Sequence, residues 1–302
     1  MTEERILLID LDSTIPNLAL MKISAYWKSK GCEVGFTTKD PTRAYISGIF
    51  KKNRGRAETS AYFLSLTYPG IIIDIGGSGY DLKKELPEEI EQMQPDYDLY
   101  PDCKYSIGFT TRGCIRACPF CIVPHKEGKL HRVSSIEKIY NPKFKAIKLM
   151  DNNILGDFDN FKKIIEFCKN HGLKLDVSQG LDARLLTQES ADLLASIKPM
   201  HTWDFAFDSM AYKDDVLRSL SLLKNAGINT RNLVQYYVYC DKSDGDYGFK
   251  SARERCRILK ENNTNAYVML NIDEEPTTEM KHLKRWANRK HIFWSIEFEE
   301  YN

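Results

Sequence analysis

Short apolar runs and amphipathic segments alternate along the first third of the chain. Runs of strand length, bounded by turn-forming residues, fall at 5–10, 33–37, 44–50 and 70–75. Apolar residues at helical spacing fall between them, at 18–30 and 56–68. The last run, GIIIDI, is unbroken and rich in β-branched residues, which is typical of the centre of a parallel sheet. The pattern predicts an α/β domain over residues 1–95.

The same alternation continues about six times after residue 104. Strands are predicted at 105–110, 146–151, 173–178, 203–208, 233–240 and 266–271. Helices are predicted at 160–170, 188–196, 214–225 and 249–261. Such alternation is typical of a parallel sheet with right-handed crossovers, whose functional residues lie at the carboxyl ends of the strands. The stretch MQPDYDLYP at 93–101 indicates a linker, so a second domain is predicted over 96–302.

Composition narrows the class of protein. A chain of 302 residues with 42% hydrophobic and 28% charged residues is typical of a globular protein of two modest domains. Its net charge of +1 gives no global reason to bind nucleic acid or an anionic membrane, but it leaves room for a local basic patch. The N-terminus is acidic where a signal peptide is basic, and no apolar stretch approaches the ~20 residues of a spanning helix. We therefore expect a cytoplasmic protein with reduced thiols and no membrane partner.

The candidate chemistry is concentrated in the stretch TTRGCIRACPFCIVPHKEG at 110–128. Its cysteines, Cys114, Cys118 and Cys121, are close enough to converge on one cofactor, and thiolates are the preferred ligands of iron–sulfur clusters. The fourth ligand of a ferredoxin run is missing, and no later cysteine pair completes a zinc ribbon. Three ligands indicate a metal site with a vacant position. The other five cysteines are scattered, and small buried side chains are the expectation for most of them.

This stretch resembles the radical S-adenosylmethionine (radical SAM) family. The resemblance is carried by C-x3-C-x2-C, with Phe120 before the last cysteine, after the strand-like run at 105–110. It implies that Cys114, Cys118 and Cys121 hold a [4Fe–4S] cluster whose fourth iron binds S-adenosylmethionine (SAM). Reductive cleavage of SAM then gives a 5′-deoxyadenosyl radical that abstracts hydrogen from a substrate. The resemblance also implies a partial (β/α)6 TIM-type barrel and a flavodoxin- or ferredoxin-type electron donor.

Residues 1–95 resemble the cobalamin-binding-like domain, a doubly wound parallel sheet, found ahead of many radical SAM barrels. The matching features are PNLALMKISAYWKSKG after the first strand and GGSGYDLKKELPEEI after the fourth. The cobalamin signature D-x-H-x-x-G is absent, and the first 100 residues contain no histidine. Cobalamin is therefore not favoured but stays open, since fold resemblance does not carry function. The whole arrangement is similar to radical SAM proteins of bacteria and their viruses.

Polar residues at the predicted strand ends are candidates for SAM contacts. Asp151 and Asn152 stand where many family members carry glycine-glycine-glutamate; Asp151 can pair with an ammonium, and a solvated turn is the alternative. Gln179 can bond the ribose and Arg184 can clamp the SAM carboxylate. Asp182 is a third candidate here, although it can instead orient Arg184 or cap a helix.

Two further strand ends, and the C-terminal tail, leave alternatives open. Asp208 can contact SAM or cap a helix. Cys240 is a candidate catalytic residue that donates hydrogen to a substrate radical, and a buried structural thiol is the alternative. The tail KRWANRKHIFWSIEFEEY mixes basic and aromatic residues, which is compatible with nucleic-acid contact, but Trp286, Ile292 and Phe293 at this spacing more often close a core, which is the favoured interpretation.

The leading functional hypothesis is a radical SAM enzyme acting on a substrate that the sequence does not identify. A cobalamin-dependent radical SAM methyltransferase is one alternative. A methylthiotransferase-like RNA-modifying enzyme is another, but it would need three more cysteines in the first domain, which contains only Cys32. A third alternative, from a different class, is a non-catalytic iron–sulfur sensor or nucleic-acid-binding protein.

Overall fold

The computed structural model describes residues 4–301 and has a mixed α/β fold with parallel sheets. It divides into two compact units, Met1–Ile107 and Gly108–Asn302. The division lies after the predicted linker, because residues that follow 95 bond to the first unit. Asp96 accepts a hydrogen bond from Ser24 Oγ at 2.6 Å, and Tyr100 Oη donates to Asp10 at 2.7 Å.

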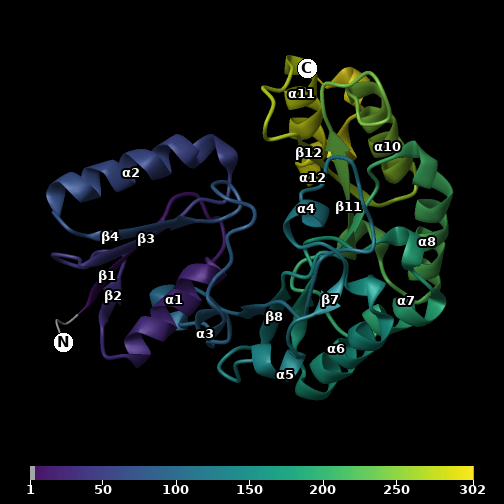
Figure 1. Ribbon diagram of the computed structural model, residues 1–302. Helices are drawn as coiled ribbons and strands as arrows, with labels where there is room; N and C mark the ends of the chain where they lie inside the picture. Colours follow the sequence, from purple (N-terminus) through teal and green to yellow (C-terminus); the bar gives the residue numbers. More distant parts are fainter. Residues whose placement is uncertain (1–3, 302) are drawn as a thin grey trace. The chain divides into compact units, whose positions relative to one another are not determined.

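The first unit is a four-stranded parallel sheet with a helix on each face (Figure 1). Its strands are β1 (Arg5–Asp10), β2 (Glu33–Gly35), β3 (Arg43–Ser47) and β4 (Ile72–Gly76), in the order β2-β1-β3-β4. Its helices are α1 (Leu18–Ser29), α2 (Arg54–Thr67) and the short α3 (Glu88–Glu91). The predicted strands and the two long helices are confirmed. The central position predicted for GIIIDI is wrong: within the described residues β4 is an edge strand, paired only with β3, and its Ile72 is 49% exposed.

The second unit contains parallel strands that follow one another in sequence order. They are β5 (Ser106–Gly108), at the division between the units, β8 (Ala146–Leu149), β9 (Lys174–Asp176), β10 (Trp203–Ala206), β11 (Val234–Cys240) and β12 (Asn265–Leu270). They form sheets β5-β8-β9 and β10-β11-β12, which two parallel bridges connect, Leu175 to Pro199 and Leu181 to Phe205. All six predicted strands are present, most of them shorter than predicted at their ends.

Helices alternate with these strands, as the hydrophobic pattern predicts. The long ones are α6 (Phe158–His171), α7 (Gln188–Ala195), α8 (Lys213–Asn225) and α10 (Phe249–Glu261), which succeed one another along one side of the strands (Figure 1). Short helices are α4 (Val123–Lys126), α5 (Ile136–Ile139) and α9 (Thr230–Leu233). The apolar face of each long helix packs on the strands, which forms one continuous core.

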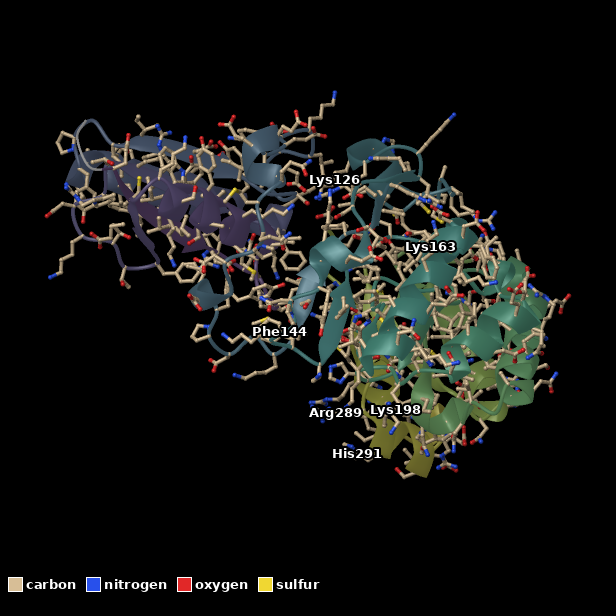
Figure 2. All side chains as sticks on the ribbon, turned by 90° about the horizontal axis from the view of Figure 1, so that it is seen from below. Lys126, Phe144, Lys163, Lys198, Arg289 and His291 are labelled. Atoms are coloured by element: carbon tan, nitrogen blue, oxygen red, sulfur yellow. The ribbon has the colours of Figure 1, made fainter. Side chains whose placement is uncertain are left out.

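The C-terminal tail closes this core with α11 (Thr278–Ala287) and α12 (Lys290–Ser295). Trp286 is 2% exposed and Phe293 is fully buried, so the prediction that the tail's aromatic residues close a core is confirmed. The basic residues of the same tail are not part of the core. Arg289 and His291 are exposed at the surface (Figure 2).

Candidate functional site

A two-stranded hairpin holds the ends of the cysteine loop together. Strand β6 (Thr111–Arg112) pairs antiparallel with β7 (His131–Arg132), and Cys114 N donates to Gly128 O at 3.2 Å. Gly113 makes this closure possible: its φ is +75°, and a Cβ there would lie 2.3 Å from Lys129 O. The three cysteines are therefore carried on a loop whose base is fixed where β5 ends.

The three thiols are free and half-buried. Arg116 N donates to Cys114 Sγ at 3.3 Å, and Val123 N donates to Cys121 Sγ at 3.5 Å. Burial raises the pKa of Cys118 and Cys121; the neighbouring thiols and Asp208 raise it further, while Arg184 lowers that of Cys118. Within residues 4–301, no three His, Cys, Asp or Glu side chains form a preassembled metal site. The donor type fits an iron–sulfur cluster, and assembly would have to draw the thiols together and remove their protons.

Asp151 fixes the start of the cysteine loop to the end of β8. Its buried carboxylate accepts hydrogen bonds from the backbone and hydroxyl groups of Thr110 and Thr111, at 2.6 Å from Thr111 N. Burial raises the pKa of Asp151, and these four hydrogen bonds oppose the rise. With four donors already bound, Asp151 acts on the site through the loop backbone.

Glu127 and Asn152 hold the other end of the loop. Glu127 accepts from Gly113 N at 3.1 Å and from Asn152 Nδ2 at 2.6 Å, and it pairs with Arg112 at 3.3 Å. Burial opposes ionisation of Glu127, but these donors outweigh it and hold its pKa below the ordinary value. The Asn152 amide is therefore directed at Glu127.

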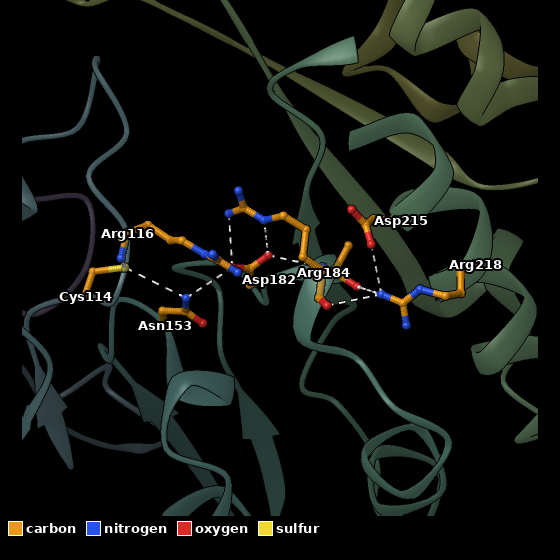
Figure 3. A network of polar contacts seen from close by, with 8 residues as sticks. Cys114, Arg116, Asn153, Asp182, Arg184, Asp215 and Arg218 are labelled. Carbon is orange, nitrogen blue, oxygen red and sulfur yellow. Dashed lines mark hydrogen bonds and ion pairs between the residues drawn. The ribbon is translucent and has the colours of Figure 1, made fainter. Parts of the chain in front are cut away.

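Asp182 is the centre of a polar network beside Cys114 (Figure 3). Its carboxylate accepts from Arg184 Nε at 2.6 Å and Nη2 at 3.0 Å, and from Arg116 Nε at 2.9 Å. Burial alone would raise the pKa of Asp182, but the two guanidinium groups lower it below its ordinary value, so the carboxylate is ionised near neutral pH. Asp182 Oδ1 also accepts from Arg184 N, so it caps a turn as well as orienting Arg184.

Asn153 contains an unsatisfied buried acceptor in this network. Its Nδ2 donates to Asp182 Oδ2 at 3.5 Å and approaches Cys114 Sγ at 3.8 Å, but its buried Oδ1 has no partner among residues 4–301. The ionised Asp182 can only accept, so turning the amide round would direct oxygen against oxygen. Because an unsatisfied buried oxygen costs about 1–3 kcal/mol, this atom is an acceptor that a bound ligand with a donor group would satisfy.

The remaining predicted residues divide into those near the thiols and those elsewhere. Asp208 accepts from Tyr239 N at 3.0 Å, burial raises its pKa to about 6, and it acts electrostatically on Cys118 and Cys121. Phe120 stacks on Tyr239 with ring centroids 4.2 Å apart. Gln179 is exposed, and Cys240 is buried in the hydrophobic core, where burial raises its pKa to about 11. The core position of Cys240 favours the structural interpretation over the catalytic one.

The strand faces below the loops carry a second buried polar network. Lys148 Nζ on β8 pairs with Asp176 at 2.6 Å on β9 and donates to Ser178 Oγ at 2.7 Å. On β10, Asp204 accepts from Thr202 Oγ1 at 2.8 Å, and burial raises its pKa to about 6. Among residues 4–301, no lysine or arginine forms an ion pair with Asp204.

Sequence reasoning missed Arg116, Glu127, Asn153 and Tyr239. Asn153 follows Asn152 at the same strand end, so its position was a usable signal. The partners of Arg116 and Tyr239 are set by the tertiary fold: Arg116 and Asp182 are 66 positions apart.

Comparison with protein-family models gives no match for this chain, and comparison with curated protein sequences gives none either. Of the helices within residues 4–301, none combines the length and apolar character required to cross a membrane. The functional assignment therefore depends on the cysteine loop and its surroundings.

Proposed function

We propose that this chain is a radical SAM enzyme in which Cys114, Cys118 and Cys121 hold a [4Fe–4S] cluster that binds SAM. The proposal is carried by three free thiols on one loop, of which Cys114 Sγ lies 3.8 Å from Asn153 Nδ2, beside a buried acceptor, Asn153 Oδ1, that has no donor within residues 4–301. When bound, the cluster supplies the electron that cleaves SAM to the 5′-deoxyadenosyl radical, which abstracts hydrogen from a substrate. A flavodoxin- or ferredoxin-type protein would be the electron donor.

The chain's own polar groups suit the two ends of an amino-acid moiety. Asn153 Oδ1 can accept from an ammonium group, which supplies the donor that this atom lacks. Arg184 uses Nε and Nη2 on Asp182, and its Nη1 can donate to a carboxylate. In this proposal Asp182 and Arg116 position Arg184 and Asn153. Asp151 fixes the start of the cysteine loop through its bonds to Thr110 and Thr111.

Two finer features of the fold belong to the same proposal. We infer that the six strands of the second unit form part of a (β/α)6 barrel, which their sequence order and the bridges between β9 and β10 support. We also infer that the first unit is a doubly wound domain, which the helices on both faces of its parallel sheet support (Figure 1). Cobalamin is not part of the proposal, because residues 1–100 contain no histidine to ligate it.

The test is anaerobic reconstitution with iron and sulfide, reduction with dithionite and incubation with SAM. We expect bound iron and sulfide in a ratio near that of a [4Fe–4S] cluster and formation of 5′-deoxyadenosine and methionine. Replacement of Cys114, Cys118 or Cys121 by alanine should abolish both results. Cys32→Ala, a change of the same type at a half-buried cysteine of the first unit, is the matched control and should retain both. Protein that holds zinc, or a cluster that leaves SAM intact, would overturn the proposal.

A further inference from the structure

The amino ends of the parallel strands in the second unit form a surface of one charge. We define the amino-end face by the six segments that lead into β8 to β12 and into α12, some of which include the first residues of those elements. The segments are 140–145, 171–174, 196–202, 226–233, 262–265 and 288–291. These six segments contain seven Lys and Arg residues and no Asp or Glu. The whole chain has 43 Lys and Arg against 42 Asp and Glu, a net charge of +1. The six segments alone have a net charge of +7, so net positive charge is concentrated in them.

The opposite ends of the same strands have the opposite character. The loops that follow β10, β11 and β12, at 207–212, 241–248 and 271–277, contain seven Asp and Glu residues and one lysine. Parallel strands place all their amino ends at one edge and all their carboxyl ends at the other. The second unit is therefore polarised along its strands, which its small net charge conceals.

Three lysines of the amino-end face are held side by side by the backbone. Lys174 N donates to Lys145 O at 3.1 Å, and Leu175 N donates to Lys198 O at 3.1 Å, so Lys145, Lys174 and Lys198 lie on adjacent segments. All three are exposed. Neighbouring strands are about 4.8 Å apart, so these ammonium groups repel one another. Within the described residues, none of the three forms an ion pair that would offset this repulsion.

The basic residues of the tail extend the same face. The Arg231 guanidinium lies 4.3 Å from the Trp294 ring centroid, and Trp294 Nε1 donates to Asn265 Oδ1 at 3.0 Å. Asn265 Nδ2 donates to Arg231 O at 2.6 Å, which ties the start of β12 to α9. In the view of Figure 2, Lys198, Arg289 and His291 lie along the same edge of the second unit, and Lys126 and Lys163 lie away from that edge. In the tail, the basic residues Arg289 and His291 thus lie at the surface, and the aromatic residues Trp286 and Phe293 lie in the core.

We propose that the amino-end face binds the phosphate backbone of a nucleic acid. Exposed lysine and arginine side chains on rigid strand ends provide the charge that releases counterions from a polyanion. Exposed amide side chains in the same segments, such as Asn232 and Asn263, suit phosphate oxygens and bases as well. The planar Arg231 and His291 can stack on unpaired bases. An acidic polypeptide would pair with the positive charge but would leave the groups that suit bases unused. The surface lies at the opposite strand ends from the cysteines, so the inference is independent of the proposed enzyme activity.

The test is fluorescence anisotropy of the full chain with a fluorescein-labelled 20-nucleotide RNA and the DNA duplex of the same length. For about four phosphate contacts, affinity for the single strand should fall about 50-fold between 50 and 200 mM salt. The triple variant Lys174→Gln, Lys198→Gln, Arg289→Gln should bind at least about 10-fold more weakly and show a smaller salt dependence. The triple variant Lys39→Gln, Lys163→Gln, Lys250→Gln removes the same charge from exposed positions elsewhere and should bind within about 2-fold of the unmodified protein.

Four results would overturn the proposal. Equal weakening by the two triple variants would assign binding to net charge, and no effect of either would assign it to another surface. Competition by poly-L-glutamate as effective as that by unlabelled RNA would point to an acidic protein partner. Cys114→Ala should bind both oligonucleotides as the unmodified protein does; a loss in this variant would move the binding to the cysteine site. All six substituted side chains are exposed, and circular dichroism checks that both variants are folded.

Discussion

At the scale of single residues, Asn153 links the fold to the proposed ligand site. Its amide is fixed by Asp182, which cannot donate, and by Cys114. The amide oxygen is buried and has no partner in the described part of the chain, which costs the ligand-free protein stability. Such unsatisfied groups persist where a ligand supplies the missing bond. Asn153 therefore has opposite effects on stability and on binding.

Asn153→Leu is expected to separate these two effects. An apolar side chain of similar size removes the unsatisfied oxygen, and Asp182 keeps its bonds from Arg116 and Arg184. The free energy of unfolding without ligand should stay within about 1 kcal/mol of the original or rise, while affinity for SAM should fall about 10-fold. Urea unfolding and equilibrium dialysis of the reconstituted protein measure the two quantities.

Asn153→Asp is the matched comparison, because it keeps an oxygen but adds a second carboxylate beside Asp182. It should retain SAM binding and lose stability, the reverse of Asn153→Leu. Unchanged SAM affinity in Asn153→Leu would show that Oδ1 has no part in binding SAM.

The cysteine spacing was readable from the sequence, but the network around it was not. Three thiols within eight residues are a local signal that survives in any fold. Arg116 and Asp182 meet only because the loop after β5 and the loop after β9 lie at the same strand ends. Likewise, the sequence indicated that Asp151 was polar and at a strand end; the bonds from Thr110 and Thr111 that occupy it depend on tertiary packing.

At the scale of elements, the β6–β7 hairpin determines whether the cysteine loop can close. Gly113→Ala would force a side chain into positive φ and bring its Cβ within 2.3 Å of Lys129 O. Gly128 also has positive φ, at +70°, but a Cβ there meets nothing within 4 Å. Gly128→Ala should therefore cost about 1 kcal/mol for the backbone alone, and Gly113→Ala at least about 2 kcal/mol more.

Chemical unfolding of the two alanine variants, together with bound iron after reconstitution, measures this difference. Gly128→Ala should keep most of its iron and Gly113→Ala should lose it. Equal losses of stability would contradict the close approach at Gly113.

The strands β8 to β10 carry buried ionisable side chains, and the cost of burying the Asp204 carboxylate depends on pH. Burial raises the pKa of Asp204 from 3.8 to about 6, so the folded state disfavours the ionised carboxylate. This cost is absent below pH about 4, grows between about 4 and about 6, and is complete above that range. Asp204→Asn should therefore match the original near pH 4 and exceed its stability at pH 7.5 by at most about 3 kcal/mol.

Asp157→Asn is the control of opposite sign. A hydrogen bond from Arg132 lowers the pKa of Asp157, so its contribution is present at neutral pH and is lost as the pH falls. That variant should be less stable than the original from pH 7.5 down to about pH 4, and approach it only as the pH falls below the ordinary pKa of 3.8. Urea unfolding from pH 7.5 to about pH 3 measures both effects, and a lower stability of Asp204→Asn at pH 7.5 would contradict the expected cost of ionising Asp204.

At the scale of the whole molecule, the order and type of most elements followed from hydrophobic periodicity. The helix predicted at 249–261 coincides with α10, because the spacing of its apolar residues and the turns on either side indicate the same helix bounds. The position of β4 within its sheet did not follow, since a β-branched run indicates a strand but not its neighbours. The polarised charge of the second unit was also invisible in the net charge, because the topology, and not the composition, gathers the lysines at one edge.

The division of the chain into two units predicts that damage to one will not spread to the other. Asp12 holds the loop after β3 by accepting from Ile49 N at 2.7 Å, Phe50 N at 3.1 Å and Asn53 Nδ2 at 2.8 Å. Asp12→Ala leaves these donors without their acceptor, which should cost about 2–4 kcal/mol within the first unit. If each unit has its own core, hydrogen exchange should accelerate for amides of β1, β3 and β4 and stay unchanged for β10, β11 and β12.

Asp12→Asn keeps one acceptor oxygen and should give a smaller acceleration in the same strands. Equal acceleration in both sets of strands would mean that the two units unfold as one, and the cysteine site would then depend on the stability of both.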